Sequence, residues 1–78
     1  MTNKIYVDVV TIHYKSGSIK PLFIVWNNGQ KYPIDRIKNI TRAASLKAGG
    51  CGIRYTCIIN NQERYLFLEE DKWFIEGR

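Results

Sequence analysis

The sequence predicts an all-β domain, either a small SH3-like barrel or a strongly curled antiparallel sheet of about six strands. Apolar residues recur at every second position along most of the chain, a spacing that is typical of strands. Short clusters of turn residues separate these apolar runs. A chain of 78 residues leaves room for one hydrophobic core, so we expect a single domain over residues 1–78.

The first expected strand covers residues 5–14, IYVDVVTIHY. Its apolar positions change parity after Val9, which indicates a bulge or a strong bend. A turn at SGS (16–18) leads into IKPLFIVW (19–26), which is apolar on both faces. Pro21 has no backbone N–H, so it restricts the start of this second strand to an edge or a first position.

Three further turns divide the rest of the chain. NG at 28–29 predicts a hairpin, because a type I′ turn needs positive φ at both central residues. NNQ at 60–62 predicts a second tight turn, since Asn tolerates positive φ. The last two expected strands, ERYLFLEE (63–70) and KWFIE (72–76), join across Glu70 and Asp71.

The strand IRYTCII (53–59) has the clearest alternation in the chain. Arg54 and Thr56 belong to one face, and four less polar residues belong to the other: Ile53, Tyr55, Cys57 and Ile59. We therefore expect Tyr55 to lie in the core, where it cannot serve as a stacking surface.

The connection at residues 35–52 is ambiguous. Ile34, Ile37 and Ile40 recur every third residue. Ala43, Ala44 and Leu46 follow, which favours a helix that Gly49 would end. The alternative is a bulged strand through Ile40. The segment 38–47 is therefore expected to hold either one short helical turn or an irregular strand.

The net charge of +5 is unevenly distributed. Residues 1–48 carry eight basic and two acidic residues, a balance of +6, whereas residues 49–78 carry four basic and five acidic residues, a balance of −1. Such asymmetry favours an anionic partner or self-association of unlike faces. The expected partners are thus nucleic acid, an acidic protein or a second copy of the chain.

No residue pattern indicates catalysis or metal binding. The single histidine, His13, lies beside a turn, and Cys51 and Cys57 have no C-x-x-C spacing. We therefore expect no enzyme, no metal and no cofactor. Cysteines outside any disulfide framework are typical of a reducing cytosol, and no leader or long apolar run is present, so we expect a cytoplasmic protein without a membrane role.

The glycine-rich stretch KAGGCGIRYT (47–56) has two interpretations. Its lysine precedes the glycines and a strand follows them, which excludes the nucleotide-hydrolase phosphate loop. Successive glycines can still expose backbone N–H groups to an anion. The favoured alternative is a corner where the chain turns or passes close to another strand.

The basic residues around this stretch are the candidate binding residues, because nucleic-acid binding needs cations that follow phosphates. The anion- or nucleic-acid-binding candidates are Arg36, Lys38, Arg42, Lys47, Gly49, Gly50 and Arg54. Trp26 and Trp73 are interface candidates, although large rings in a small domain more often anchor the core.

The run from Ile19 to Ile75 resembles a family of short, uncharacterised bacterial proteins of about this length. The resemblance rests on a W-x-x-G-x-x-Y-x-I-D hairpin, an A-G-G-x-G-I-R-Y segment and a final K-W-F strand. It implies a small all-β domain and no established activity.

The function we expect is that of a non-catalytic binding module, associated with nucleic acid through its basic residues. The alternative is a protein-interaction or homodimer domain that uses exposed aromatics or an edge strand.

Overall fold

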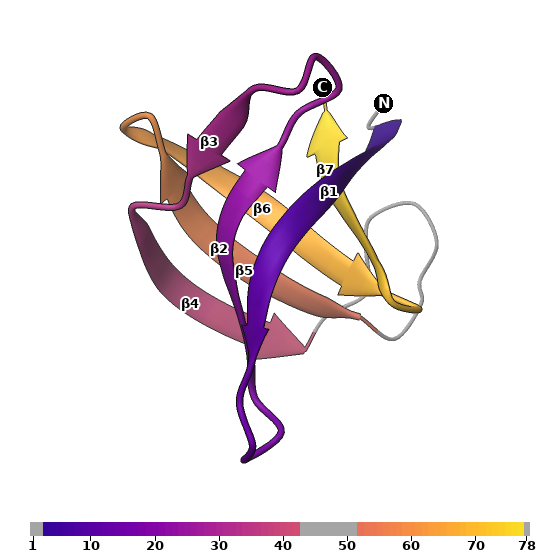
Figure 1. The fold of residues 1–78 in the computed structure, drawn as a ribbon, viewed down its shortest axis with the longest axis vertical. Coiled ribbons are helices and arrows are strands. Elements are labelled where there is room, and N and C mark those ends of the chain that lie inside the picture. The colour runs from indigo at the N-terminus through magenta and orange to yellow at the C-terminus, as the bar shows by residue number, and fades with distance from the viewer. Residues whose placement is uncertain (1–2, 43–51, 78) are drawn as a thin grey trace.

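The computed structural model describes residues 3–42 and 52–77, which form antiparallel strands (Figure 1). The strands are β1 (Asn3–His13), β2 (Ile19–Val25), β3 (Lys31–Pro33), β4 (Arg36–Arg42), β5 (Ile53–Ile59), β6 (Gln62–Glu69) and β7 (Lys72–Gly77). Within these two ranges there is no helix, and so none that could cross a membrane. The prediction of an all-β fold is confirmed.

The strands form one sheet in the order β3-β2-β1-β7-β6-β5-β4, which curls into a half-barrel (Figure 1). The two edge strands, β3 and β4, follow one another in the chain and are separated by Ile34 and Asp35 alone. These two residues tie the edges together, because Ile34 N donates to Leu22 O and Asp35 N donates to Ile58 O, both at 2.9 Å. The seventh strand is β4, which lies in the connection at residues 35–52 that the sequence left ambiguous.

The connection after Ile34 begins as a bulged strand, so for residues 38–42 the irregular-strand alternative is confirmed and the helical turn is wrong. Residues 43–47 lie outside the described residues. Ile37 pairs with Cys57 and Ile40 pairs with Tyr55, with a register shift between Ile37 and Asn39. Lys38 is the extra residue of the bulge, so the alternation of side chains shifts by one position after it. Ile37 and Ile40 therefore lie on the same face of the strand although they are three residues apart. This bulge produced the spacing that resembled a helix.

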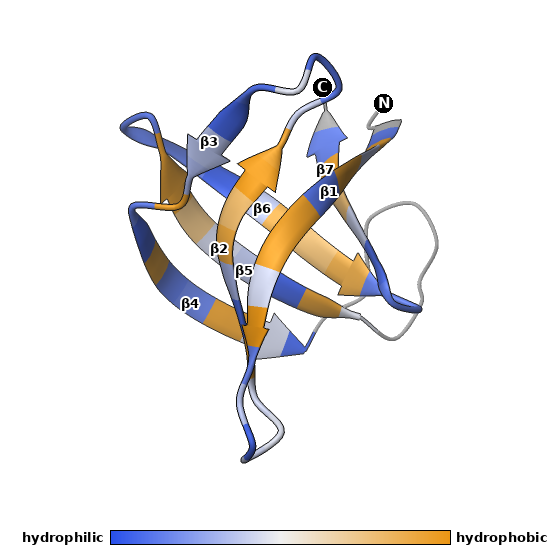
Figure 2. Ribbon diagram, in the orientation of Figure 1, coloured by the Kyte–Doolittle hydropathy of each residue, from blue (hydrophilic) through white to orange (hydrophobic). Residues whose placement is uncertain are grey.

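The bulge expected in the first strand lies on its partner. Val10 pairs with Phe23 and Thr11 pairs with Pro21, which leaves Leu22 as the extra residue on β2. The side chains of β1 therefore keep their alternation, and the apolar residues from Val10 onward at every second position are exposed. Their exposed fractions are 41% for Val10, 38% for Ile12 and 45% for Tyr14. Figure 2 shows the apolar residues along β1 and β2 in orange.

The hairpins use two kinds of turn. At the β2–β3 hairpin Gly29 N donates to Trp26 O at 2.8 Å, and Gly29 alone has positive φ (84°), the pattern of a three-residue loop with a glycine bulge. The hairpin is confirmed there, but its predicted type I′ turn is wrong. Two-residue loops with positive φ at both positions occur instead at Asn60-Asn61 and at Glu70-Asp71.

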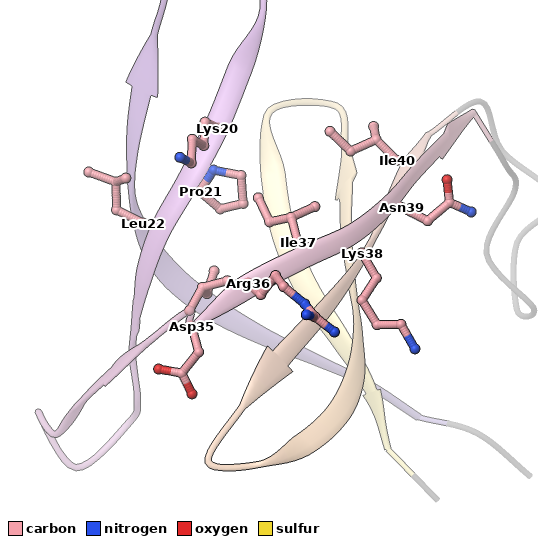
Figure 3. A pocket seen from close by; sticks show the side chains of 10 residues that line it. Lys20, Pro21, Leu22, Asp35, Arg36, Ile37, Lys38, Asn39 and Ile40 are labelled. Atoms are coloured by element: carbon pink, nitrogen blue, oxygen red, sulfur yellow. The ribbon is translucent and has the colours of Figure 1, made fainter.

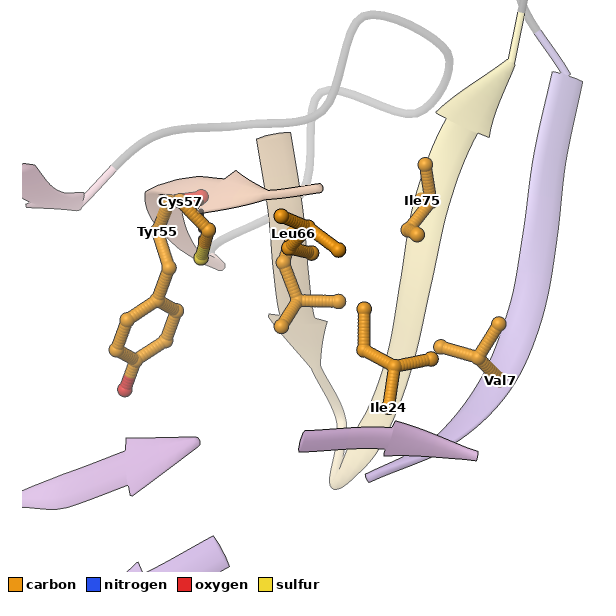
Figure 4. Packing of buried hydrophobic residues seen from close by; sticks show 7 residues of the cluster. Val7, Ile24, Tyr55, Cys57, Leu66 and Ile75 are labelled. Atoms are coloured by element: carbon orange, nitrogen blue, oxygen red, sulfur yellow. Dashed lines mark hydrogen bonds between the residues drawn. The ribbon is translucent and has the colours of Figure 1, made fainter. Parts of the chain in front are cut away.

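The main core cluster lies on the inner face of the curled sheet (Figure 4), whereas Phe67 and Phe74 are buried on the face that carries Arg54. It consists of Val7, Ile24, Tyr55, Cys57, Ile59, Leu66 and Ile75. Tyr55 crosses this core from β5, and its hydroxyl donates to Ile19 O on β2 at 3.0 Å. Burial raises the pKa of the Tyr55 hydroxyl, with a smaller contribution from Cys57. Burial also raises the pKa of the Cys57 thiol to about 11.

Candidate functional site

The predicted cations of the described chain are concentrated on β4, and Arg36, Lys38 and Arg42 are all exposed. Figure 3 shows the charged ends of Arg36 and Lys38 on the side of β4 away from β2. Arg36 pairs with Ile58, which faces outward, and Lys38 Nζ lies 3.8 Å from Glu63 Oε1. Both cations therefore belong to the outer face of the sheet.

Arg54 lies on the same outer face one strand further in. It is half-buried between Thr41 of β4 and Phe67 of β6. Its guanidinium carbon lies 4.9 Å from the centroid of the Tyr65 ring, which is a cation–π contact. Its Nε atom is buried and has no hydrogen-bond partner within the described part of the chain. The position of Arg54 is thus set by the aromatic ring and the sheet.

Tyr65 supplies an exposed ring on this face. It pairs with Thr56 of β5, which pairs in turn with Asn39 of β4, so the three side chains form one row across the sheet. Tyr65 is 48% exposed. The two neighbouring rows carry Arg36 and Arg54. An accessible ring can stack on an unpaired nucleobase, and flanking cations can bind its phosphates. We refer to Arg36, Lys38, Arg54 and Tyr65 as the outer-face cluster.

Tyr65 was not among the predicted binding residues, although the sequence contains a signal for its position. Tyr55 is an inner residue, and the two-residue turn at Asn60-Asn61 fixes the register of the hairpin. In that register Tyr65 stands opposite Thr56, on the outer face. Counting outward from the turn therefore identifies Tyr65 as the ring that shares a face with Arg54.

The remaining predicted binding residues are not brought into the cluster. Arg42 pairs with Ile53, a partly buried residue packed against the core, at the far end of β4. Lys47, Gly49 and Gly50 lie outside the described residues. Gly52 is buried, and a Cβ at this position would collide with the side chain of Glu69. A close approach of this kind is what the corner interpretation expects of a glycine.

Trp26 and Trp73 lie half-buried against the core cluster. The Trp73 ring centroid is 5.4 Å from that of Tyr55. Both tryptophans border one hollow of about 810 Å³ that follows β1, together with Asp8 and Lys72. Both tryptophans therefore pack against the core and also line this hollow.

A second hollow, the seam groove, lies between β2 and β4, where the curled sheet does not close (Figure 3). Its volume is about 690 Å³. The lining residues are Lys20, Pro21, Leu22, Ile34, Asp35, Arg36, Ile37, Lys38, Asn39 and Ile40. Ile37 and Ile40 stand on the side of β4 that faces β2 (Figure 3). The groove thus has an apolar interior and a mainly basic rim.

The described residues show no group of three or more His, Cys, Asp or Glu side chains placed to hold a metal ion. His13 is exposed beside the β1–β2 turn. Lys4 Nζ lies 3.4 Å from Glu69 Oε1, an ion pair on the outer side of the sheet. The described surface therefore offers charged side chains, an exposed aromatic ring and the edge of a strand for binding.

No protein-family model, no curated protein and no solved structure matches this chain. The resemblance to a family of short bacterial proteins therefore stays a prediction.

Proposed function

We propose that the domain is a non-catalytic module that binds nucleic acid through the outer-face cluster. The observation that carries this proposal is the half-exposed ring of Tyr65 on the same face as three cations. The cations neutralise phosphates, and the ring stacks on an unpaired base.

The charge of the face supports an anionic ligand. Arg36 and Lys38 are exposed, and Lys38 Nζ lies 3.8 Å from the carboxylate of Glu63. Both side chains of this pair are nearly half exposed, at 44% and 49%. An exposed pair of this kind contributes about 0–1 kcal/mol, so a phosphate can replace Glu63 at little cost.

Arg54 has a positioning role in this proposal. Its guanidinium packs against the Tyr65 ring, so it restricts the rotation of the ring while adding positive charge beneath the ligand. Stacking tolerates any base, because every base has a π face. The module is therefore expected to bind single strands with little sequence preference.

The test is fluorescence anisotropy with a labelled single-stranded oligonucleotide of about ten nucleotides, as DNA and as RNA, over a range of salt concentrations. The logarithm of the binding constant should fall linearly with the logarithm of salt concentration. Each phosphate contact that is removed should flatten that slope by about 0.7. Arg36→Gln with Lys38→Gln should therefore flatten it by about 1.4.

The matched control is Lys15→Gln with Lys72→Gln, which removes two exposed cations outside the cluster. This control should leave the slope unchanged. Tyr65→Ala should weaken binding by about 1–3 kcal/mol without changing the slope, and Tyr65→Phe should restore the affinity. Absence of binding to either nucleic acid at low salt, or an equal loss in the control, would overturn the proposal.

A further inference from the structure

The edge strand β4 leaves one side of its backbone unpaired. β4 is the last strand in the sheet order, and among the described residues it pairs only with β5. It contains 7 residues, and the seam groove of about 690 Å³ lies along it. An unpaired strand edge beside an apolar groove is a template for an added strand.

The opposite wall of the groove, formed by β2, offers few free backbone groups. Pro21 has no N–H to donate. The carbonyl of Ile19 accepts a hydrogen bond from the Tyr55 hydroxyl at 3.0 Å, and that of Leu22 accepts one from Ile34 N at 2.9 Å. An extended ligand in the groove would therefore pair with β4 and only pack against β2.

The interior of the groove is suited to apolar side chains. Ile37 and Ile40 both face β2 (Figure 3). Ile40 is 56% exposed, the largest exposed fraction among the exposed large hydrophobic residues of the described chain. Alternate side chains of an added strand would point into this apolar space, since the side-chain period of a strand is two.

The rim of the groove selects the charge of the ligand. Lys20, Arg36 and Lys38 stand on the rim against one acidic residue, Asp35. A second copy of β4 would place Arg36, Lys38 and Arg42 of one chain near those of the other. Like charges across paired strands are destabilising. An acidic strand would instead lie close to Lys20 of β2 and to Arg36 and Lys38, whose charged ends project from the other side of β4 (Figure 3).

We propose that an acidic, extended protein segment adds to the open edge of β4, with its apolar side chains in the seam groove. The site shares Arg36 and Lys38 with the outer-face cluster, but it uses the strand edge and Ile40 in place of the exposed ring of Tyr65. By contrast, the other sheet edge is poorly suited to strand addition, since β3 has 3 residues and ends in Pro33.

The test is a nuclear magnetic resonance titration with a seven-residue peptide of alternating glutamate and valine, equal in length to β4 (7 residues). The peptide should shift the amide signals of Arg36–Arg42 and slow their hydrogen exchange. A peptide with lysine in place of glutamate should do neither. Equal binding of the lysine peptide, or shifts confined to other strands, would overturn the proposal.

Two uncharged substitutions locate the contact. Ile40→Thr removes the apolar surface but keeps strand propensity, and it should weaken binding of the glutamate peptide at least fivefold. Ile12→Thr makes the same change at an exposed residue of β1 and should leave the affinity unchanged. The opposite result would assign the peptide to β1 and overturn the proposal.

The same variants separate this inference from nucleic-acid binding. Ile40→Thr should leave oligonucleotide affinity unchanged, and Tyr65→Ala should leave peptide affinity unchanged. If sedimentation shows a dimer in which the β4 amides are protected without peptide, the occupant of the edge is a second copy and the proposal fails.

Discussion

The two three-stranded meanders of the sheet, β1–β3 and β5–β7, differ in how completely they are paired and buried. β5 and β6 pair without interruption from Ile53–Leu68 to Ile59–Gln62, and β7 continues the ladder on β6. Five of the seven core residues come from β5–β7 (Tyr55, Cys57, Ile59, Leu66 and Ile75). This meander forms the main wall of the core.

The β1–β3 meander is less regular. A bulge interrupts β1–β2 pairing after Val10, and β3 has only 3 residues. Its hairpin loops depend on positive φ at Gly17 and Gly29, whereas the loops of β5–β7 contain no glycine. It contributes Val7 and Ile24 to the core. Two similar apolar patterns therefore differ in burial, because Val10 and Ile12 lie on the exposed face of β1.

The largest expected difference between the meanders comes from shortening one aliphatic side chain in each. Leu66→Ala in β6 should lower the free energy of unfolding by about 2–5 kcal/mol, because the Leu66 side chain is 0% exposed and its removal leaves a cavity. Val10→Ala in β1 should cost within about 0.5 kcal/mol, since Val10 is 41% exposed. Urea denaturation of both variants checks the comparison, and equal losses would contradict it.

Alkaline pH should weaken the β5–β7 meander through Cys57. Burial raises the pKa of its thiol from 9.0 to about 11, so between these values the unfolded chain loses the proton first. The contribution of Cys57 to the free energy of unfolding should therefore be fully present below pH 9 and be lost as pH rises towards 11, by on the order of 2–3 kcal/mol. Denaturation curves at several pH values measure this loss.

The control for the pH effect is Cys57→Ala, which has no ionisable group at this position. Its stability will be lower at neutral pH because a buried atom is removed, but its decline between pH 9 and 11 should be shallower. An unchanged decline would assign the alkaline effect to other groups, among them Tyr55, whose pKa is also raised.

The smallest expected effect concerns the hydrogen bond that joins the two meanders. Tyr55→Phe removes the hydroxyl that donates to Ile19 O, and should cost about 0.5–1.5 kcal/mol. Tyr14→Phe removes an exposed hydroxyl and should change stability by less than about 0.5 kcal/mol. Thermal denaturation of both variants checks the difference. A Tyr55→Phe variant as stable as Tyr14→Phe would show that the hydrogen bond between the meanders does not stabilise the fold.

Part of the candidate site could be read from the sequence. Arg36, Lys38 and Arg54 were selected as cations, and the inward position of Tyr55 followed from the alternation of β5. Tyr65 was missed as the exposed ring because its face depends on the register across a turn. The helical turn was wrong because a bulge at Lys38 imitates a spacing of three.

The all-β class, the positions of the tight turns and the inner face of β5 could be predicted from the sequence alone. These follow from side-chain alternation and backbone φ preferences, which act over a few residues. Only the tertiary structure decided which strand carried each bulge, which cations share a face with Tyr65, and that β4 ends as an open edge. Those features depend on pairing between residues far apart in the chain, and local patterns do not specify such pairing.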